Sequence, residues 1–148
     1  MKIGGLAFED VRIDFPSWPA LKPKTPYGQV PLLEIDDGPP ITQSFAMLRY
    51  VGRLTGLYPE DPVLAMQIDE VCGLQEDMAR ALAPSMAIGM RPETFGYPAD
   101  LADAEKKAIQ AKLRAALVAE GGDIPRYLGY FEAMLEKNGE SRVFVQCD

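Results

Sequence analysis

The pattern of apolar and polar residues in the first third of the chain is typical of short strands joined by loops. Residues 9–15 alternate between apolar and polar side chains, which predicts a half-buried strand. The apolar run at residues 30–35 predicts a second strand, and residues 39–42, after an Asp-Asp-Gly turn signal, predict a short edge strand where prolines are tolerated. Residues 16–28 contain four prolines and predict a loop.

Beyond this region the apolar residues recur at steps of three and four, which indicates helices. Capping residues are expected at both ends of the helical region, where Thr42 or Ser44 begins the first helix and Asp123 begins the last. The predicted helices run from Thr42 or Ser44 to about Gly56, from 63 to about 86, from about 100 to 120, and from 123 onward.

These elements predict a mixed fold class, α/β in the first part of the chain and all-α in the second. Residues 1–57 would form the first domain and residues 63–148 the helical one. Residues 58–62 contain two prolines and two acidic residues, so we expect them to be the linker.

Composition and charge exclude several classes of function. The 148 residues carry a net charge of -7, and an acidic surface repels phosphate backbones, so we expect no nucleic-acid partner. No apolar run approaches the roughly 20 residues that span a bilayer, and Glu9 and Asp10 follow too soon for a secretory leader. We therefore expect a cytoplasmic protein with no membrane partner.

The sequence contains no histidine, which limits the chemistry of any site. A Ser/His/Asp triad, a Cys/His pair and a histidine metal site are all excluded. The two cysteines stand far apart and form no Cys-x-x-Cys pair. We therefore expect no metal.

Three short segments could together bind a small peptide with an anionic group at each end. Pro31 opens a strand after a loop, so the Val30–Pro31 bond is a candidate for the cis form. A cis bond there would leave the Val30 backbone groups to pair with an extended peptide. Gln43 and Ser44, at the start of a helix, offer an amide, a hydroxyl and exposed N–H groups to one carboxylate.

Trp18 and Lys22 stand four residues apart in the preceding loop and could hold the second carboxylate through an indole N–H and an ammonium group. Each candidate also has an ordinary structural interpretation. Gln29 would be a loop amide, Ser44 a helix cap and Trp18 a partly buried anchor. Only the combination favours a binding site.

The same segments resemble glutathione transferases. The resemblance rests on Trp-Pro-Ala-Leu-Lys at 18–22, Gly-Gln-Val-Pro-Leu-Leu-Glu at 28–34, Gln-Ser at 43–44 with Arg-Tyr at 49–50, and residues 124–132 in the helical part. The sigma class, which includes the glutathione-dependent prostaglandin D synthases, is the most similar. The resemblance implies a partial thioredoxin-like N-terminal domain followed by a helical C-terminal domain of the glutathione S-transferase type.

The resemblance also implies roles for individual residues toward glutathione, the expected substrate. The glycine carboxylate would be held by Trp18 and Lys22. The remaining ligands would be the Val30 backbone ahead of cis-Pro31 for the cysteinyl unit, Gln29 and Gln43 for the tripeptide in general, and Ser44 for the γ-glutamyl carboxylate.

Dimerisation and catalysis follow from the resemblance as well. Asp77 would reach across a homodimer interface, although a solvated helix face is the ordinary interpretation of that residue. The family's catalytic tyrosine or serine lies at the end of a strand that would precede Gly4, so we assign no catalytic residue here. Tyr27, beside the ligand strand, is expected to pack its ring in a turn.

The implied function is conjugation of glutathione to small hydrophobic electrophiles, a detoxification reaction. The alternative is a non-catalytic protein of the same fold that binds glutathione or has a structural role, as S-crystallins do. Whether the chain is itself an enzyme stays open at this point.

Overall fold

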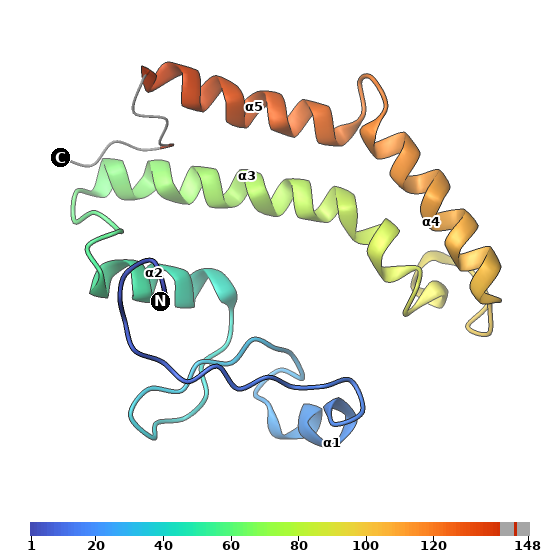
Figure 1. Ribbon diagram of the computed structural model, residues 1–148, viewed down its shortest axis with the longest axis horizontal. Coiled ribbons are helices and arrows are strands. Elements are labelled where there is room, and N and C mark those ends of the chain that lie inside the picture. Colours follow the sequence, from blue (N-terminus) through green and yellow to red (C-terminus); the bar gives the residue numbers. More distant parts are fainter. Residues whose placement is uncertain (140–143, 145–148) are drawn as a thin grey trace. The chain divides into compact units, whose positions relative to one another are not determined.

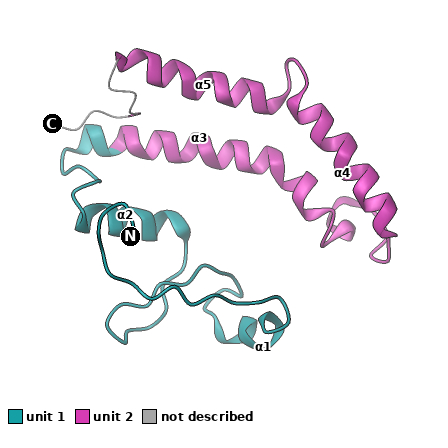
Figure 2. Cartoon of the chain, in the orientation of Figure 1, with its two compact units in different colours: residues 1–65 teal, residues 66–148 magenta. Residues whose placement is uncertain are grey.

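The computed structural model describes residues 1–139 and residue 144. The chain divides into two compact units, residues 1–65 and 66–148 (Figure 2). This division falls just beyond the predicted linker at 58–62, whose role as a domain boundary stays a prediction.

Three helical elements lie wholly within the first unit, and Figure 1 labels two of them, α1 and α2. They are α1 (Trp18–Leu21), the 3₁₀ helix η1 (Lys22–Lys24) and α2 (Ser44–Leu54). The prediction of a loop over 16–28 is therefore wrong for its central part. Both α1 and η1 have a proline in the first turn, where the missing N–H costs nothing and the fixed φ angle favours a helix.

The predicted strand at residues 9–15 is wrong. In the described part of the chain, residues 7–14 form no backbone hydrogen bond with another segment. The apolar side chains of the alternating pattern are exposed, with Val11 at 72% and Phe15 at 86%. A strand exists only where a neighbour completes its hydrogen bonds, and alternation along one segment does not supply that neighbour.

Residues 30–35 and 39–42 meet in one antiparallel pair. The Leu33 N–H donates to the Ile41 carbonyl at 2.9 Å, and the Ile41 N–H donates to the Leu33 carbonyl at 2.8 Å. The turn between them closes with a bond from the Gly38 N–H to the Ile35 carbonyl at 2.9 Å. The two predicted strands are therefore reduced, within the described residues, to an isolated bridge.

Two prolines explain why the pairing does not extend. With Leu33 opposite its partner at position 41, the next hydrogen-bonded pairs in the same register would be Pro31 with Gln43 and Ile35 with Pro39. Each of these pairs lacks one donor because proline has no N–H. The register of the hairpin is therefore fixed by one hydrogen-bonded pair, Leu33 with Ile41.

Helix α2 matches the prediction in position but not in its cap. Ser44 is the first helical residue, and the residue before it is Gln43, whose side chain makes no capping hydrogen bond. The expectation that Thr42 or Ser44 caps this helix is therefore wrong. The backbone of Gln43 has φ 75° and ψ 102°, and this turn brings the chain into the helix without a side-chain cap.

The N-terminal turn lies against the end of α2. A Cβ atom on Gly4 would stand 2.2 Å from Cγ2 of Thr55, so only glycine fits there. The hydroxyl of Thr55 donates to the Val51 carbonyl at 2.9 Å, which holds this side chain at the end of the helix.

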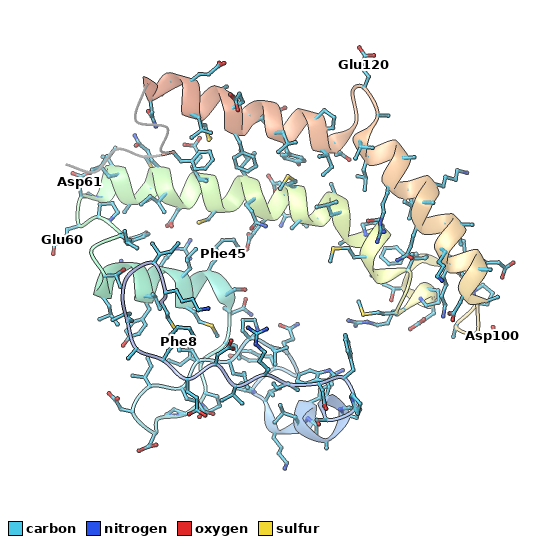
Figure 3. The ribbon with its side chains drawn as sticks, viewed as in Figure 1. Phe8, Phe45, Glu60, Asp61, Asp100 and Glu120 are labelled. Atoms are coloured by element: carbon cyan, nitrogen blue, oxygen red, sulfur yellow. The ribbon has the colours of Figure 1, made fainter. Side chains whose placement is uncertain are left out.

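The second unit is helical, as predicted. It contains α3 (Pro62–Ala87, whose first turn belongs to the first unit), the 3₁₀ helix η2 (Pro92–Phe95), α4 (Asp103–Val118) and α5 (Asp123–Lys137). Figure 3 shows Glu120 in the tight turn that joins α4 to α5. The residue before α5 is Gly122, not Asp123, so the predicted aspartate cap is wrong. Asp123 instead forms an ion pair with Arg126 inside the helix.

The end of α3 is the most buried part of this unit. Ser85 and Ile88 are each 1% exposed. From α4, the side-chain amide of Gln110 donates to the Ser85 carbonyl at 3.1 Å. None of the helices described by the structure is long and apolar enough to cross a membrane.

Candidate functional site

The hairpin brings two of the predicted ligand segments together. Pro31 lies two residues before one partner of the bridge, and Gln43 lies two residues after the other. The bridge therefore brings the segment that contains Val30 and Pro31 to the same end of the hairpin as Gln43 and Ser44. The Val30–Pro31 peptide bond is cis, which confirms the prediction for that bond.

The backbone groups of Val30 are unpaired within the described residues. The residue is 49% exposed, and neither its N–H nor its carbonyl forms a hydrogen bond with the residues that the structure describes. An extended peptide laid beside this segment could pair with both groups as an added strand does.

The start of α2 provides donors for an anion. The first hydrogen bond of the helical ladder runs from the Met47 N–H to the Gln43 carbonyl at 3.1 Å. The N–H groups of Ser44, Phe45 and Ala46 therefore precede the ladder and have no acceptor within the helix. In an 11-residue helix, these groups and the helix dipole favour a negative charge at this end.

Gln43 adopts an unusual conformation beside these donors. A positive φ is uncommon for a residue with a side chain, and backbone strain of this kind costs about 1–3 kcal/mol. Such strain often marks a functional site, and here it falls on a predicted ligand.

The α1–η1 segment contributes the predicted pair Trp18 and Lys22. Trp18 is the first residue of α1 and is half-buried, whereas Lys22 is the first residue of η1 and is exposed. The stem of Lys22 lies over Gly28, because a Cβ atom there would stand 3.3 Å from Cε and 3.6 Å from Cγ of the lysine. This contact places Lys22 beside Gln29, which is exposed.

Asp14 is a site-associated residue that the sequence interpretation missed. Its Oδ1 atom accepts a hydrogen bond from the Ser17 N–H at 2.8 Å, immediately before α1. Hydrogen bonding from the Ser17 side chain and backbone lowers the pKa of the Asp14 carboxyl below its ordinary value. The available signal was an aspartate three residues before a Ser-Trp-Pro helix start.

Two other candidates lie apart from these segments or differ from expectation. Asp77 is half-buried on α3, in the second unit, and forms an ion pair with Arg80 one turn later. Its role at a dimer interface stays a prediction. Tyr27 is 70% exposed, so the expectation that it packs its ring is wrong. Among the described residues, no group of three or more Cys, Asp or Glu side chains is arranged to hold a metal ion.

Comparison with known proteins supports the predicted family. Residues 1–53 match the model of the glutathione S-transferase N-terminal domain. Glutathione S-transferase 1 of Ascaris suum is 44% identical over 84 residues, which cover 57% of this chain and 40% of that protein. These matches confirm the predicted resemblance to the glutathione S-transferase family.

Two further matches agree with the sigma-class resemblance. Hematopoietic prostaglandin D synthase of Gallus gallus is 40% identical over 73 residues, 49% of this chain and 36% of that protein. The solved structure of prostaglandin synthase D of Nilaparvata lugens aligns with a TM-score of 0.72 and 29% identity, covering 92% of this chain and 59% of that one. The predicted family and fold class are confirmed.

The glutathione S-transferase relatives are longer than the matched region. The alignments cover about 40% of the two curated relatives, 40% and 36% respectively. The roles of individual residues toward glutathione stay predictions, and so does the activity of the whole protein.

Proposed function

We propose that this chain binds glutathione for a transferase that conjugates the tripeptide to small hydrophobic electrophiles. Family membership supports the transferase activity at the level of the family. The observation that carries the proposal for this chain is the register of the hairpin. Its one bridge, between Leu33 and Ile41, brings the segment that contains Val30 beside the segment that leads into α2, the end of the helix that offers N–H groups to an anion.

The proposed ligand lies between the two anion-binding groups. Its γ-glutamyl carboxylate would meet Ser44 and the first N–H groups of α2, and its cysteinyl unit would pair with the Val30 backbone. The amides of Gln29 and Gln43 would hold the tripeptide between these points. The family resemblance assigns its glycine carboxylate to the α1–η1 segment, through the indole N–H of Trp18 and the ammonium group of Lys22.

Binding and chemistry are separate requirements in this proposal. The reactive form of glutathione is the thiolate, which attacks the electrophilic carbon. A free thiol has a pKa of about 8.5, so ionisation at neutral pH requires a shift of one to two units, or about 1.4–2.7 kcal/mol. We assign no residue of this chain to that step.

The assembly and location of the protein are parts of the same proposal. Homodimerisation would bring Asp77 of each subunit toward the γ-glutamyl amine bound by the other. The proposed location is the cytoplasm. No observation favours the non-catalytic, S-crystallin-like alternative over the transferase.

Isothermal titration calorimetry with glutathione tests the binding site. Lys22→Ala and Ser44→Ala each remove a partner from one carboxylate, and a charge-assisted hydrogen bond contributes about 1.5–3 kcal/mol. Each variant should therefore raise Kd about ten-fold or more. Lys24→Ala is the matched control, because Lys24 is an exposed lysine at the other end of η1 and should leave Kd unchanged.

Circular dichroism should first show that the variants keep the helical content of the wild type. An equal rise in Kd in Lys22→Ala and Lys24→Ala would show that the affinity for glutathione depends only on the net charge of the segment. A wild-type chain that fails to bind glutathione at millimolar concentration would refute the proposal.

A further inference from the structure

The α1–η1 segment is held at both of its ends by side-chain hydrogen bonds. At the far end, the Thr25 hydroxyl donates to the Lys22 carbonyl at 2.8 Å, and Thr25 is only 8% exposed. At the near end, Asp14 Oδ1 accepts the Ser17 N–H at 2.8 Å. The buried end is fixed by packing, whereas the exposed end depends on Asp14.

We propose that Asp14 is a positioning residue that fixes Trp18 at the start of α1. Ser17 immediately precedes the helix and makes no side-chain capping bond of its own, so the acceptor at this end comes from Asp14. The Trp18 N–H donates to the Phe15 carbonyl at 3.3 Å, which closes the same turn. Asp14 therefore holds the turn from which the indole extends.

Helix α1 depends on such an anchor because of its length. It has four residues, and helices this short are not stable through their own hydrogen bonds. Its backbone bonds run from Leu21 to the Ser17 carbonyl at 3.3 Å and from Lys22 to the Trp18 carbonyl. If the turn at Ser17 relaxes, both bonds lose their geometry.

The chemistry of the acceptor also suits this role. A carboxylate accepts a backbone N–H more strongly than a neutral oxygen does. The lowered pKa of Asp14 agrees with the ionised form being the hydrogen-bonded one. An amide oxygen at the same position could still accept the bond, whereas a methyl group could not.

The effect on ligand binding rests on the proposed function, in which Trp18 contacts the glycine carboxylate of glutathione. A correctly placed indole would be ready to donate its N–H. A relaxed turn would have to be reordered on binding, at a cost to affinity.

The sequence contains one tryptophan and six tyrosines, so fluorescence excited at the long-wavelength edge of the indole band, where tyrosine does not absorb, reports on Trp18 alone. Acrylamide quenching of the ligand-free protein measures how the indole is held, and fluorescence titration with glutathione measures Kd. The variants are Asp14→Ala, Asp14→Asn and the control Asp10→Ala. Asp10 is an exposed aspartate of the same segment that pairs with Arg12.

We expect Asp14→Ala to increase the quenching constant and to raise Kd about five-fold, the effect of losing a typical helix cap. Asp14→Asn should restore both values to within about two-fold of the wild type, because the amide oxygen keeps the bond to Ser17. Asp10→Ala should match the wild type in both measurements.

The two measurements separate the two proposals. Unchanged quenching in Asp14→Ala would overturn the positioning role, and so would an Asp14→Asn variant as perturbed as Asp14→Ala. If the quenching constant changes in Asp14→Ala and returns to the wild-type value in Asp14→Asn, the positioning role is supported even if the wild type fails to bind glutathione. In that case only the proposed function would be refuted.

Discussion

Replacing Gly28 by alanine tests whether the backbone near the candidate site controls the position of Lys22. Gly28 has φ +65°, a left-handed conformation, and the Lys22 stem lies directly over it. An added Cβ atom would therefore have two separate effects, one on the backbone of residue 28 and one on the lysine.

The backbone effect is the larger one for stability. A residue with a side chain pays about 1–2 kcal/mol in the left-handed region. Lower entropy of the unfolded chain returns about 0.4–1 kcal/mol of this. The net loss in free energy of unfolding should be about 0–1.6 kcal/mol.

The steric effect acts on binding. The new Cβ atom would stand 3.3 Å from Cε and 3.6 Å from Cγ of Lys22, so the flexible stem must move by a few tenths of an ångström. That movement displaces the ammonium group proposed to meet the glycine carboxylate. Part of a charge-assisted bond worth about 1.5–3 kcal/mol would be lost, which corresponds to a rise in Kd of up to about ten-fold.

A double-mutant cycle separates the two effects. Urea denaturation and calorimetry with glutathione should be carried out on Gly28→Ala, Lys22→Ala and the double variant. The loss of stability should be the same in both backgrounds, whereas the loss of affinity should vanish once Lys22 is alanine. Gly5→Ala is the matched control, because Gly5 has φ +69° but has nothing within 4 Å of the added Cβ atom.

An equal loss of affinity in both backgrounds would refute this reasoning. The backbone conformation at residue 28, and not the position of Lys22, would then determine the affinity for glutathione.

Three further predictions concern single residues. The lowered pKa of Asp14 means that its stabilising bond is present above the ordinary carboxyl pKa and is lost as pH falls through the folded value, so tryptophan fluorescence should show an acid transition that Asp14→Asn lacks. Gln110→Ala leaves the carbonyl of buried Ser85 without its partner and should cost about 1–3 kcal/mol in urea denaturation, whereas exposed Gln75→Ala should cost little. Gly73→Ala, inside α3 with nothing near the added Cβ atom, should raise Tm through a gain of about 0.5–1 kcal/mol, and a lower Tm would contradict this.

The sequence alone was sufficient for the four long helices and for the resemblance to the family, but not for the short α1 and η1 or for the helix caps. The helices at Ser44–Leu54, Pro62–Ala87, Asp103–Val118 and Asp123–Lys137 agree with the periodicity because their hydrogen bonds connect residues four apart. The motifs around Trp18, Lys22 and Pro31 resemble those of the family, and this resemblance could be seen without a structure because a motif is a property of the chain order.

The pairing of extended segments could not be read in the same way. A strand requires a partner that is distant in sequence, and alternation at residues 9–15 does not say whether that partner is there. The hairpin also shows how local chemistry limits pairing, because Pro31 and Pro39 each remove a donor from the next pair in the register.

The arrangement of the candidate site was decided by the tertiary structure. The number of residues that separate Lys22 from Gly28, or Val30 from Ser44, does not show how closely the two residues of each pair approach in space. The Lys22 stem lies over Gly28, and the one bridge of the hairpin brings the segment that contains Val30 to the same end as Ser44. Such approaches depend on how the chain folds back in space, which the order of its residues does not specify locally.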